Sequence, residues 1–243
     1  MKIRKIESVD STNSYLKANP GAVGELTMLA AYEQTAGRGQ RGNHWEAEPG
    51  KNLTFSFYFN PEGVRPREQF AISEAVALGI TDYLSGEIEA KVKWPNDIYA
   101  GDEKIAGILI EHSIMGMEIT RSIVGVGLNI NQREFRSNAP NPTSLALLTG
   151  KTFDIDAEAV KLGKHLEKRL AMTRDEQDRE RLHADYLKHL WRHDGRNYRF
   201  VDTGTGEEFE GKIVCVEPEG LLAVKKESGR TDRFAFKEIS FII

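Results

Sequence analysis

Cysteine and long apolar runs are scarce in this sequence of 243 residues. The single cysteine, Cys215, excludes a disulfide bond within the chain, and its apolar alternating surroundings favour a structural thiol over a nucleophile. No stretch is long and apolar enough for a membrane span, and the first ten residues lack the apolar region of a signal peptide. We therefore expect a cytoplasmic protein with no membrane among its partners.

The histidines and the charged residues exclude two further kinds of site. The six histidines are scattered along the chain, without the ligand spacing of a zinc site. The formal net charge is −4 and the pI is about 5.9, with both signs interspersed along most of the chain. A nucleic-acid-binding protein would carry a basic patch, so we expect no nucleic acid among the partners.

The hydrophobic pattern predicts a chain of strands and helices in two parts. Apolar character predicts a buried strand at residues 25–33, period-two alternation predicts one at 52–59, and further strands are expected at 2–8 and in four segments between residues 90 and 130. Apolar spacing and end signals predict helices at residues 10–21, 67–86, 143–150 and about 156–191. From residue 193 short alternating strands predict a small barrel-like module, so we place two domains at 1–192 and 193–243.

A glycine-rich stretch, QTAGRGQRGNHW at residues 34–45, separates two of the predicted strands. Gly37, Gly39 and Gly42 form a literal G-x-G-x-x-G, but Pro49 and Gly50 leave no room for the helix that a dinucleotide fingerprint needs. No Gly-Lys-Ser/Thr follows, which excludes a P-loop. The short link instead predicts an antiparallel strand pair joined by a loop. With Arg38 and Arg41 this loop is either an anion-binding loop or a solvated turn.

Three further segments decide between these interpretations: DSTNSYL at 10–16, KWPNDIYAGDEKIAGILIE at 93–111 and VGVGLNIN at 124–131. In this order they resemble the biotin protein ligases, also called biotin–acetyl-CoA-carboxylase ligases. Since only ten residues precede the Ser-Thr-Asn sequence, the resemblance is to the monofunctional type without an N-terminal DNA-binding domain. It covers nearly the whole chain.

The resemblance implies a fold and an activity. The family fold is α+β: a mixed or antiparallel, class II synthetase-like sheet with helices packed on one face, followed by a small SH3-like barrel. Family members use ATP and Mg2+ to convert biotin to biotinyl-5′-AMP and then transfer biotin to a lysine of a biotin carboxyl carrier domain. Biotin, ATP and the carrier domain would thus be the partners, with a homodimer as one option for assembly.

The resemblance also assigns roles to individual residues. The positions that match the family's biotin-binding residues are Ser11, Thr12, Asn13, Gln34, Gly37, Arg38, Gly39, Gln40, Lys104, Gly107 and Gly125. Those that match its nucleotide-binding residues are Arg38, Arg41, Trp45, Lys104 and Asn129. Lys104, Arg38 and Arg41 would act in catalysis by offsetting the negative charge of carboxylate and phosphate. The resemblance names no metal ligand, although Asp97 is a candidate either for metal or for orienting the incoming lysine.

Simpler interpretations accompany several of these assignments. Ser11 or Thr12 could cap a helix, and Trp45 could be a core aromatic residue. Without the motif that flanks it, Lys104 would be interpreted as a surface lysine. Gln40 and Asn43 replace arginines that many relatives carry in the glycine loop.

Two rival functions fit the same segments less well. One is a lipoate or octanoate transferase, against which the KWPND motif and the arginine-bearing loop argue. The other is a biotin-sensing binding protein, which would not need Lys104.

Overall fold

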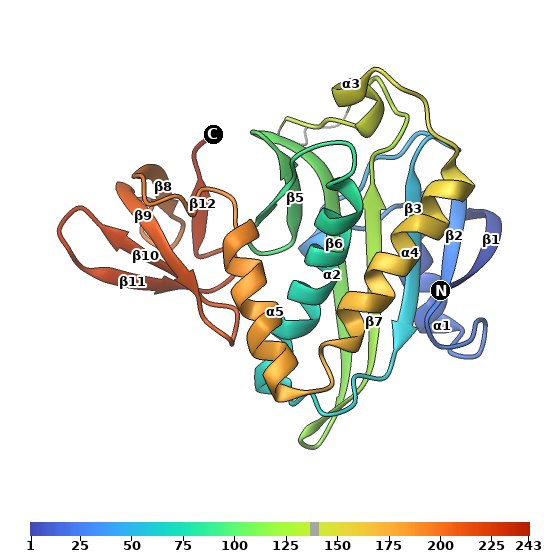
Figure 1. The fold of residues 1–243 in the computed structure, drawn as a ribbon, viewed down its shortest axis with the longest axis horizontal. Coiled ribbons are helices and arrows are strands. Elements are labelled where there is room, and N and C mark those ends of the chain that lie inside the picture. Colours follow the sequence, from blue (N-terminus) through green and yellow to red (C-terminus); the bar gives the residue numbers. More distant parts are fainter. Residues whose placement is uncertain (137–140) are drawn as a thin grey trace.

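A seven-stranded mixed sheet forms the centre of the computed structural model, which describes residues 1–136 and 141–243 (Figure 1). The strands in chain order are β1 (Lys2–Val9), β2 (Thr27–Gln34), β3 (Leu53–Phe59), β4 (Lys91–Lys93), β5 (Asp97–Ala100), β6 (Glu103–Met115) and β7 (Glu118–Leu128). Their spatial order is β1-β2-β3-β7-β6-β5-β4. β1 and β2 are parallel, and the other neighbours are antiparallel. The antiparallel β2–β3 pair predicted across the glycine loop is thereby confirmed.

The helices fall in the predicted segments, although the longest segment holds two of them, and each has a recognisable N-terminal signal or apolar face. They are α1 (Thr12–Ala18), α2 (Phe70–Leu84), α3 (Leu145–Thr149), α4 (Ile155–Ala171) and α5 (Glu176–His189), with short 3₁₀ turns η1 (Gln40–Gly42) and η2 (Pro66–Glu68). The Ser11 side chain caps α1, and Asp154 caps α4. Over the residues described, none of these helices combines the length and the apolar character needed to cross a bilayer.

The long helix predicted at about 156–191 is two helices, because the chain turns between α4 and α5. Asp175 accepts hydrogen bonds from the backbone N–H groups of Gln177 and Asp178, which caps a new helix. The Thr173 hydroxyl donates to the Leu170 carbonyl, at the end of the preceding helix. The aspartate at the start of an acidic turn was the sequence signal for this break, and the continuous charge run concealed it.

Alternation of side chains gives the main sheet two different faces. In β3, Phe55 and Phe57 belong to the main core with residues of α2 and α4, whereas Thr54 and Ser56 point to the opposite face. β7 follows the same rule, with Val124 and Val126 in the core. Helices α2, α4 and α5 cover the core face (Figure 1). On the opposite face α1 packs on a small apolar cluster that includes Leu29 and Ile123, beside small and polar side chains.

The last fifty residues form a second, antiparallel sheet of five strands. These are β8 (Tyr198–Asp202), β9 (Glu208–Val216), β10 (Leu222–Lys226), β11 (Thr231–Phe234) and β12 (Ile239–Phe241), in the spatial order β11-β10-β9-β8-β12. The predicted short strands are confirmed. As β11 and β12 are its two edges, the sheet is open in its strand pairing, and the expected closure into a barrel is not seen.

Contacts to the β4–β5 region hold this second sheet against the first. The Trp94 indole N–H donates to the Gly220 carbonyl at 3.0 Å. The rings of Trp191 and Phe241 lie 5.7 Å apart, and the Trp191 indole donates to the Gly101 carbonyl. The C-terminal sheet is therefore placed beside β5, where β12 can border the open face of the main sheet (Figure 1).

An ion-pair network in the helical layer generates the first prediction. The Arg169 guanidinium on α4 donates to Asp82 of α2 at 2.7 and 3.0 Å and to Asp185 of α5 at 3.0 Å, and its side chain is only 12% exposed. Arg169→Met should lower the free energy of unfolding by about 2 kcal/mol, because it leaves the partly buried carboxylates of Asp82 and Asp185 without their guanidinium partner.

Urea denaturation measures this loss. The control is Arg181→Met, which breaks an exposed pair with Asp178 within one helix and should cost less than about 0.5 kcal/mol. Equal effects of the two substitutions would contradict a special role for the three-helix network.

Candidate functional site

A pocket of about 780 Å³ lies on the face of the main sheet that α2, α4 and α5 leave free. Its walls come from the start of α1, the glycine loop, the β4–β5 turn and the segment around β12 in the C-terminal sheet. Its floor consists of residues of β3, β7 and β6. The pairing of these strands places Ser56, Gly125 and Leu109 side by side in one row and Thr54, Gly127 and Gly107 in the next. Four sequence segments thus meet over this floor.

A chain of buried polar groups closes one end of the pocket. Gln34 Oε1 accepts from the backbone N–H of Thr12 at 2.8 Å and from its hydroxyl at 3.0 Å. The Thr12 hydroxyl lies 2.6 Å from that of Ser56, which donates to Asn13 Oδ1 at 2.5 Å. Thr12 and Asn13 are each 3% exposed and Ser56 is fully buried. The predicted residues Ser11, Thr12, Asn13 and Gln34 are brought together, and Ser11 also caps α1 as the simpler interpretation held.

Glycines in the floor make room for side chains that stand over them. A Cβ atom at Gly125 would lie 2.3 Å from Asn13 Oδ1, and one at Gly107 would lie 2.8 Å from the Trp45 ring. A Cβ atom at Gly127 would lie 2.2 Å from Trp45 Cε2. Only glycine fits at these positions as the pocket is arranged here. Gly127 and Ser56 were missed in the sequence, although the alternation in VGVG and TFSF placed both on one face.

The glycine loop folds back on itself over the pocket. The Gly39 N–H donates to the Asn43 carbonyl at 2.7 Å, and the Trp45 N–H donates to the Gly37 carbonyl at 2.9 Å. A Cβ atom at Gly37 would lie 2.6 Å from the Trp45 carbonyl oxygen, so this glycine is needed for the close approach. Gln40 and Asn43 line the pocket. The backbone of Arg41 lies in η1, but its side chain is outside the described part of the chain.

Lys104 and Asp97 mark the other end of the pocket. Lys104 Nζ lies 2.6 Å from Asp97 Oδ1, and the side chains are 20% and 17% exposed. The register adds Asp97 to the row of Gly127 and Gly107, and Lys104 Nζ lies 5.7 Å from the centre of the Trp45 ring. The Lys104–Asp97 pair therefore stands beside the indole, at the end remote from Asn13.

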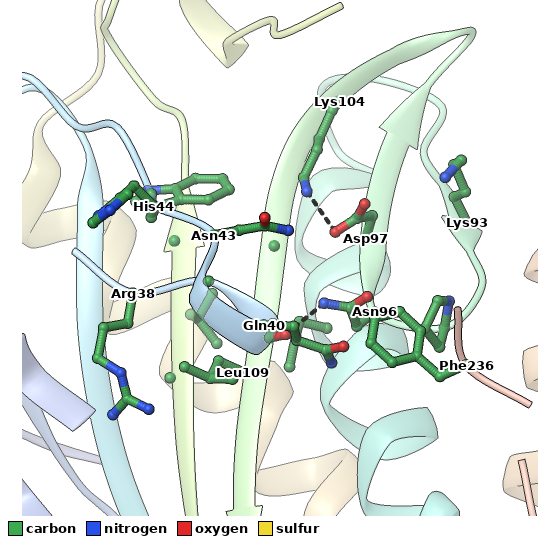
Figure 2. Close-up of a pocket in the computed structure, with 18 of the residues that line it drawn as sticks. Arg38, Gln40, Asn43, His44, Lys93, Asn96, Asp97, Lys104, Leu109 and Phe236 are labelled. Atoms are coloured by element: carbon green, nitrogen blue, oxygen red, sulfur yellow. Dashed lines mark hydrogen bonds and ion pairs between the residues drawn. The ribbon is translucent and has the colours of Figure 1, made fainter. Parts of the chain in front are cut away.

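Arg38 does not join Lys104. Its guanidinium donates to Glu111 at 3.4 Å through each of two nitrogens and to the Ser14 hydroxyl at 3.3 Å. Figure 2 shows Arg38 pointing away from the Lys104–Asp97 pair. Of the two predicted cations with described side chains, only Lys104 faces the end with Asp97.

The pocket carries an excess of positive charge. Asp97 is the only acidic side chain among the described residues that line it, against Arg38, Lys93, Lys104 and Lys237. Lys93 Nζ lies 5.2 Å and 4.7 Å from the ring centres of Tyr99 and Phe241. Burial lowers the pKa of Lys93, because the ammonium loses water there, although nearby Asp97 opposes this. A bound anion would balance this charge.

Among the residues that the structure describes, three buried polar atoms near Lys104 have no hydrogen-bond partner: Asn129 Oδ1, Trp45 Nε1 and the Tyr99 hydroxyl. The Asn129 amide donates to the Thr143 carbonyl at 2.8 Å, but its Oδ1 accepts no hydrogen bond, and Trp45 Nε1 donates none. Asn129 is 3% exposed and directly follows β7, although it does not itself line the pocket. Such atoms are costly unless a ligand or water pairs with them. Within the described ranges no cluster of three or more His, Cys, Asp or Glu side chains is arranged to hold a metal.

Residues 6–129 match the profile of the biotin/lipoate A/B protein ligase family. The chain is 33% identical over 157 residues to the bifunctional ligase/repressor BirA of Salmonella typhimurium. The aligned region covers 63% of this chain and 49% of that protein. It is 32% identical over 188 residues to the biotin–[acetyl-CoA-carboxylase] ligase of Mycobacterium tuberculosis. The aligned region covers 74% of this chain and 68% of that protein.

The fold is similar to a solved biotin protein ligase from Aquifex aeolicus in complex with biotin and ATP. The TM-score is 0.79 at 27% sequence identity, and the match covers 98% of this chain and 97% of that chain. The chain spans about half the length of the Salmonella ligase/repressor.

The close contact of Gly127 with Trp45 generates the second prediction. Gly127→Ala should displace the indole from the sheet, because a Cβ atom cannot lie 2.2 Å from Cε2. Acrylamide quenching of tryptophan fluorescence should then increase. The control is Gly86→Ala, whose Cβ would meet nothing within 4 Å. Identical quenching in both variants would contradict this placement of Trp45.

Proposed function

The chain belongs to the biotin/lipoate A/B protein ligase family, and from this we propose that it is a biotin protein ligase. It would use ATP to convert biotin to biotinyl-5′-AMP and then transfer the biotinyl group to a lysine of a biotin carboxyl carrier domain. One observation carries the proposal: a single pocket joins a buried polar cluster at one end to the Lys104–Asp97 pair at the other.

The polar end suits the ureido ring of biotin. That ring offers two N–H donors and one carbonyl acceptor, and Gly125 leaves room beneath it for the Asn13 amide that would face the ring. The hydroxyls of Ser11 and Thr12 and the amides of Asn13 and Gln34 supply acceptors and donors there, in a setting where unpaired groups are costly.

This polar chemistry separates the proposal from its closest rival. A lipoyl or octanoyl chain has no ring donors or acceptors, so it would leave Thr12, Ser56 and Asn13 without ligand partners. A site built to hydrogen-bond a ligand rejects analogues that lack those groups. A non-catalytic biotin-binding protein would have no use for Lys104 at the far end of the same pocket.

Lys104 is the residue that we propose for the adenylation step. An oxygen of the biotin carboxylate attacks the α-phosphorus of ATP, and pyrophosphate leaves as the bond between the α- and β-phosphates breaks. The Lys104 ammonium stabilises the negative charge on the α-phosphate oxygens in the transition state. Backbone N–H groups of the glycine loop, around Gly37 and Gly39, add donors without adding charge. Arg38 serves biotin in this scheme, and Arg41 is proposed for the phosphates.

Mg2+ would offset the remaining charge of the triphosphate. Mg2+ in nucleotide sites is commonly held by one or two carboxylates, water and the phosphates themselves. Asp97 is the carboxylate available for this in the pocket as described, so the donor set fits an ion that comes with ATP.

Trp45 and Asn129 are proposed for the nucleotide. The indole lies flat against the glycine floor between the Asn13 end and Lys104, where its outer face can stack on adenine. The unpartnered Asn129 Oδ1 is an acceptor of the kind that the amino group of adenine requires.

Asp97 is proposed for the transfer step. When Lys104 turns to the phosphate, the Asp97 carboxylate loses its partner at 2.6 Å and can accept a proton from the incoming lysine. The neutral ε-amine of the carrier then attacks the biotinyl carbonyl carbon, and AMP leaves with the electrons of the carbon–oxygen bond. The amide forms as the nitrogen releases its second proton to water. One ion pair would thus connect the two half-reactions.

The C-terminal part, residues 193–243, is proposed as a separate SH3-like domain that helps to dock the carrier and to cover ATP. Phe236, Ile239 and Phe241 of this part line the pocket, which supports a position beside the phosphates. We also propose that the reaction takes place in the cytoplasm.

ATP–pyrophosphate exchange tests the proposed function and the role of Lys104 in one assay. Biotin should stimulate ATP–pyrophosphate exchange, whereas lipoate and octanoate should not. Lys104→Ala should reduce the exchange rate at least tenfold, since a well-placed charged donor contributes a few kcal/mol. Its melting temperature should stay within a few degrees of the parent's.

The matched control is Lys212→Ala, at an exposed position of β9 outside the pocket. Exchange in Lys104→Ala at the rate of this control would refute the assignment. Exchange driven by lipoate rather than biotin would refute the proposed substrate.

Gln40 generates a further prediction, because it is neutral where many relatives carry arginine. A charge-assisted bond to phosphate is roughly twice as strong as a neutral one, so Gln40→Arg should stabilise bound biotinyl-5′-AMP by about 1 kcal/mol. Release of labelled adenylate in a single turnover should slow about fivefold. Gln69→Arg, outside the pocket, should leave release unchanged. Unchanged or faster release in Gln40→Arg would mean that another cation already compensates.

A further inference from the structure

Glu111 joins three elements at the polar end of the pocket, and none of the roles above uses it. It lies on the pocket side of β6, in the row next to Leu109 and Gly125. Its carboxylate accepts from Asn13 Nδ2 of α1 at 3.2 Å and from Lys17 Nζ of α1 at 3.2 Å. It also accepts from both terminal nitrogens of Arg38 at 3.4 Å. The carboxylate is 22% exposed, so solvent screens these contacts only in part.

These contacts keep Glu111 ionised. Burial alone would raise the pKa of Glu111, but hydrogen bonds from Lys17 and Asn13 and the charge of Arg38 outweigh it, and the pKa lies below its ordinary value. An ionised carboxylate only accepts hydrogen bonds. At neutral pH, then, every group that contacts Glu111 must present a donor to it.

This requirement orients the Asn13 amide. Its Nδ2 donates to Glu111 and to the Leu109 carbonyl, at 3.2 and 3.3 Å. Its Oδ1 must therefore point the other way, where it accepts from the Ser56 hydroxyl and faces the space above Gly125. A flipped amide would set Oδ1 against the carboxylate oxygen. With Nδ2 held by Glu111, the Asn13 amide presents its Oδ1 acceptor to the part of the pocket that we assign to the ureido N–H groups.

The same carboxylate helps to hold the glycine loop. Arg38 ties that loop to α1 through Ser14 and to β6 through Glu111, beside the contacts that Gln34 and Trp45 make with those elements. Without Glu111 the long side chain of Arg38 would keep one hydroxyl contact, which is too weak to offset the entropy of ordering it. Glu111 thus contributes both to the orientation of Asn13, together with the Leu109 carbonyl, and to the position of Arg38 in the loop.

We propose that Glu111 is a positioning residue for biotin: it aims the Asn13 acceptor at the ureido ring and anchors the glycine loop over that ring through Arg38. This rests on the proposed function. Because Glu111 lies at the end remote from Lys104, its loss should weaken biotin binding and leave the use of ATP nearly unchanged.

The test is Glu111→Gln, which keeps the shape but can donate as well as accept, so it weakens the constraint on the Asn13 amide and removes the ion pair with Arg38. Calorimetry without ATP should show the Kd for biotin raised at least tenfold. In pyrophosphate exchange the KM for biotin should rise by a similar factor, with kcat and the KM for ATP within about threefold of the parent's. The control is Glu118→Gln, at an exposed position of β7 outside the pocket, which should change none of these values.

A double-mutant cycle separates positioning from a general loss of structure. Arg38→Gln should raise the Kd for biotin in the parent but have much less effect when Glu111 is already glutamine, since the two act as one contact. Fully additive effects would overturn the coupling. If Glu111→Gln fails to fold, Glu111→Asp carries the test: it retains the charge but shortens the reach, and an unchanged Kd for biotin would overturn the proposal.

The outcomes also separate this inference from the proposed function. A parent protein that neither binds biotin nor exchanges pyrophosphate would refute the function itself. A parent that does both, beside a Glu111→Gln variant with unchanged Kd, would refute only the role of Glu111.

Discussion

The alternation of side chains along β3, β6 and β7 is the constraint on which the site depends. One set of positions, including Phe55, Phe57 and Val126, packs against the helical layer, and the other set builds the pocket floor. Because successive side chains point to opposite faces, each buried phenylalanine of β3 leaves a small or polar neighbour on the other face. A register slip of one residue would exchange core and floor, so the stability of the core and the shape of the site are fixed together.

On this floor the two ends of the pocket differ in chemistry. At one end Gln34, Thr12, Ser56 and Asn13 form a buried neutral chain that ends at the Glu111 carboxylate. At the other end Lys104 and Asp97 form a compact ion pair beside Trp45. A ligand with a polar ring and an anionic tail would match both ends, and biotin has this form. The distance between the ends would keep ring recognition separate from phosphate chemistry.

Much of this arrangement could be predicted from the sequence, because strand and helix patterns are local. The strands, the antiparallel β2–β3 pair and the gathering of Ser11, Thr12, Asn13 and Gln34 followed from patterns and from the family resemblance. The break at Asp175 was missed, because a continuous charge run masked an N-cap. Partners that depend on register or on long side chains were not predictable. Gly127 meets Trp45, and Arg38 turns to Glu111 rather than to Lys104, only once the loop has folded back.

The most direct test of the central claim is the identity of the molecule that the protein makes and retains. The purified chain is incubated with biotin, lipoate, octanoate and ATP together, without a carrier domain, freed from unbound ligand and examined by mass spectrometry after denaturation. The account predicts biotinyl-5′-AMP at about one molecule per chain in the parent and very little in Lys104→Ala. A lipoyl or octanoyl adenylate in place of the biotinyl one, or no adenylate at all, would contradict it.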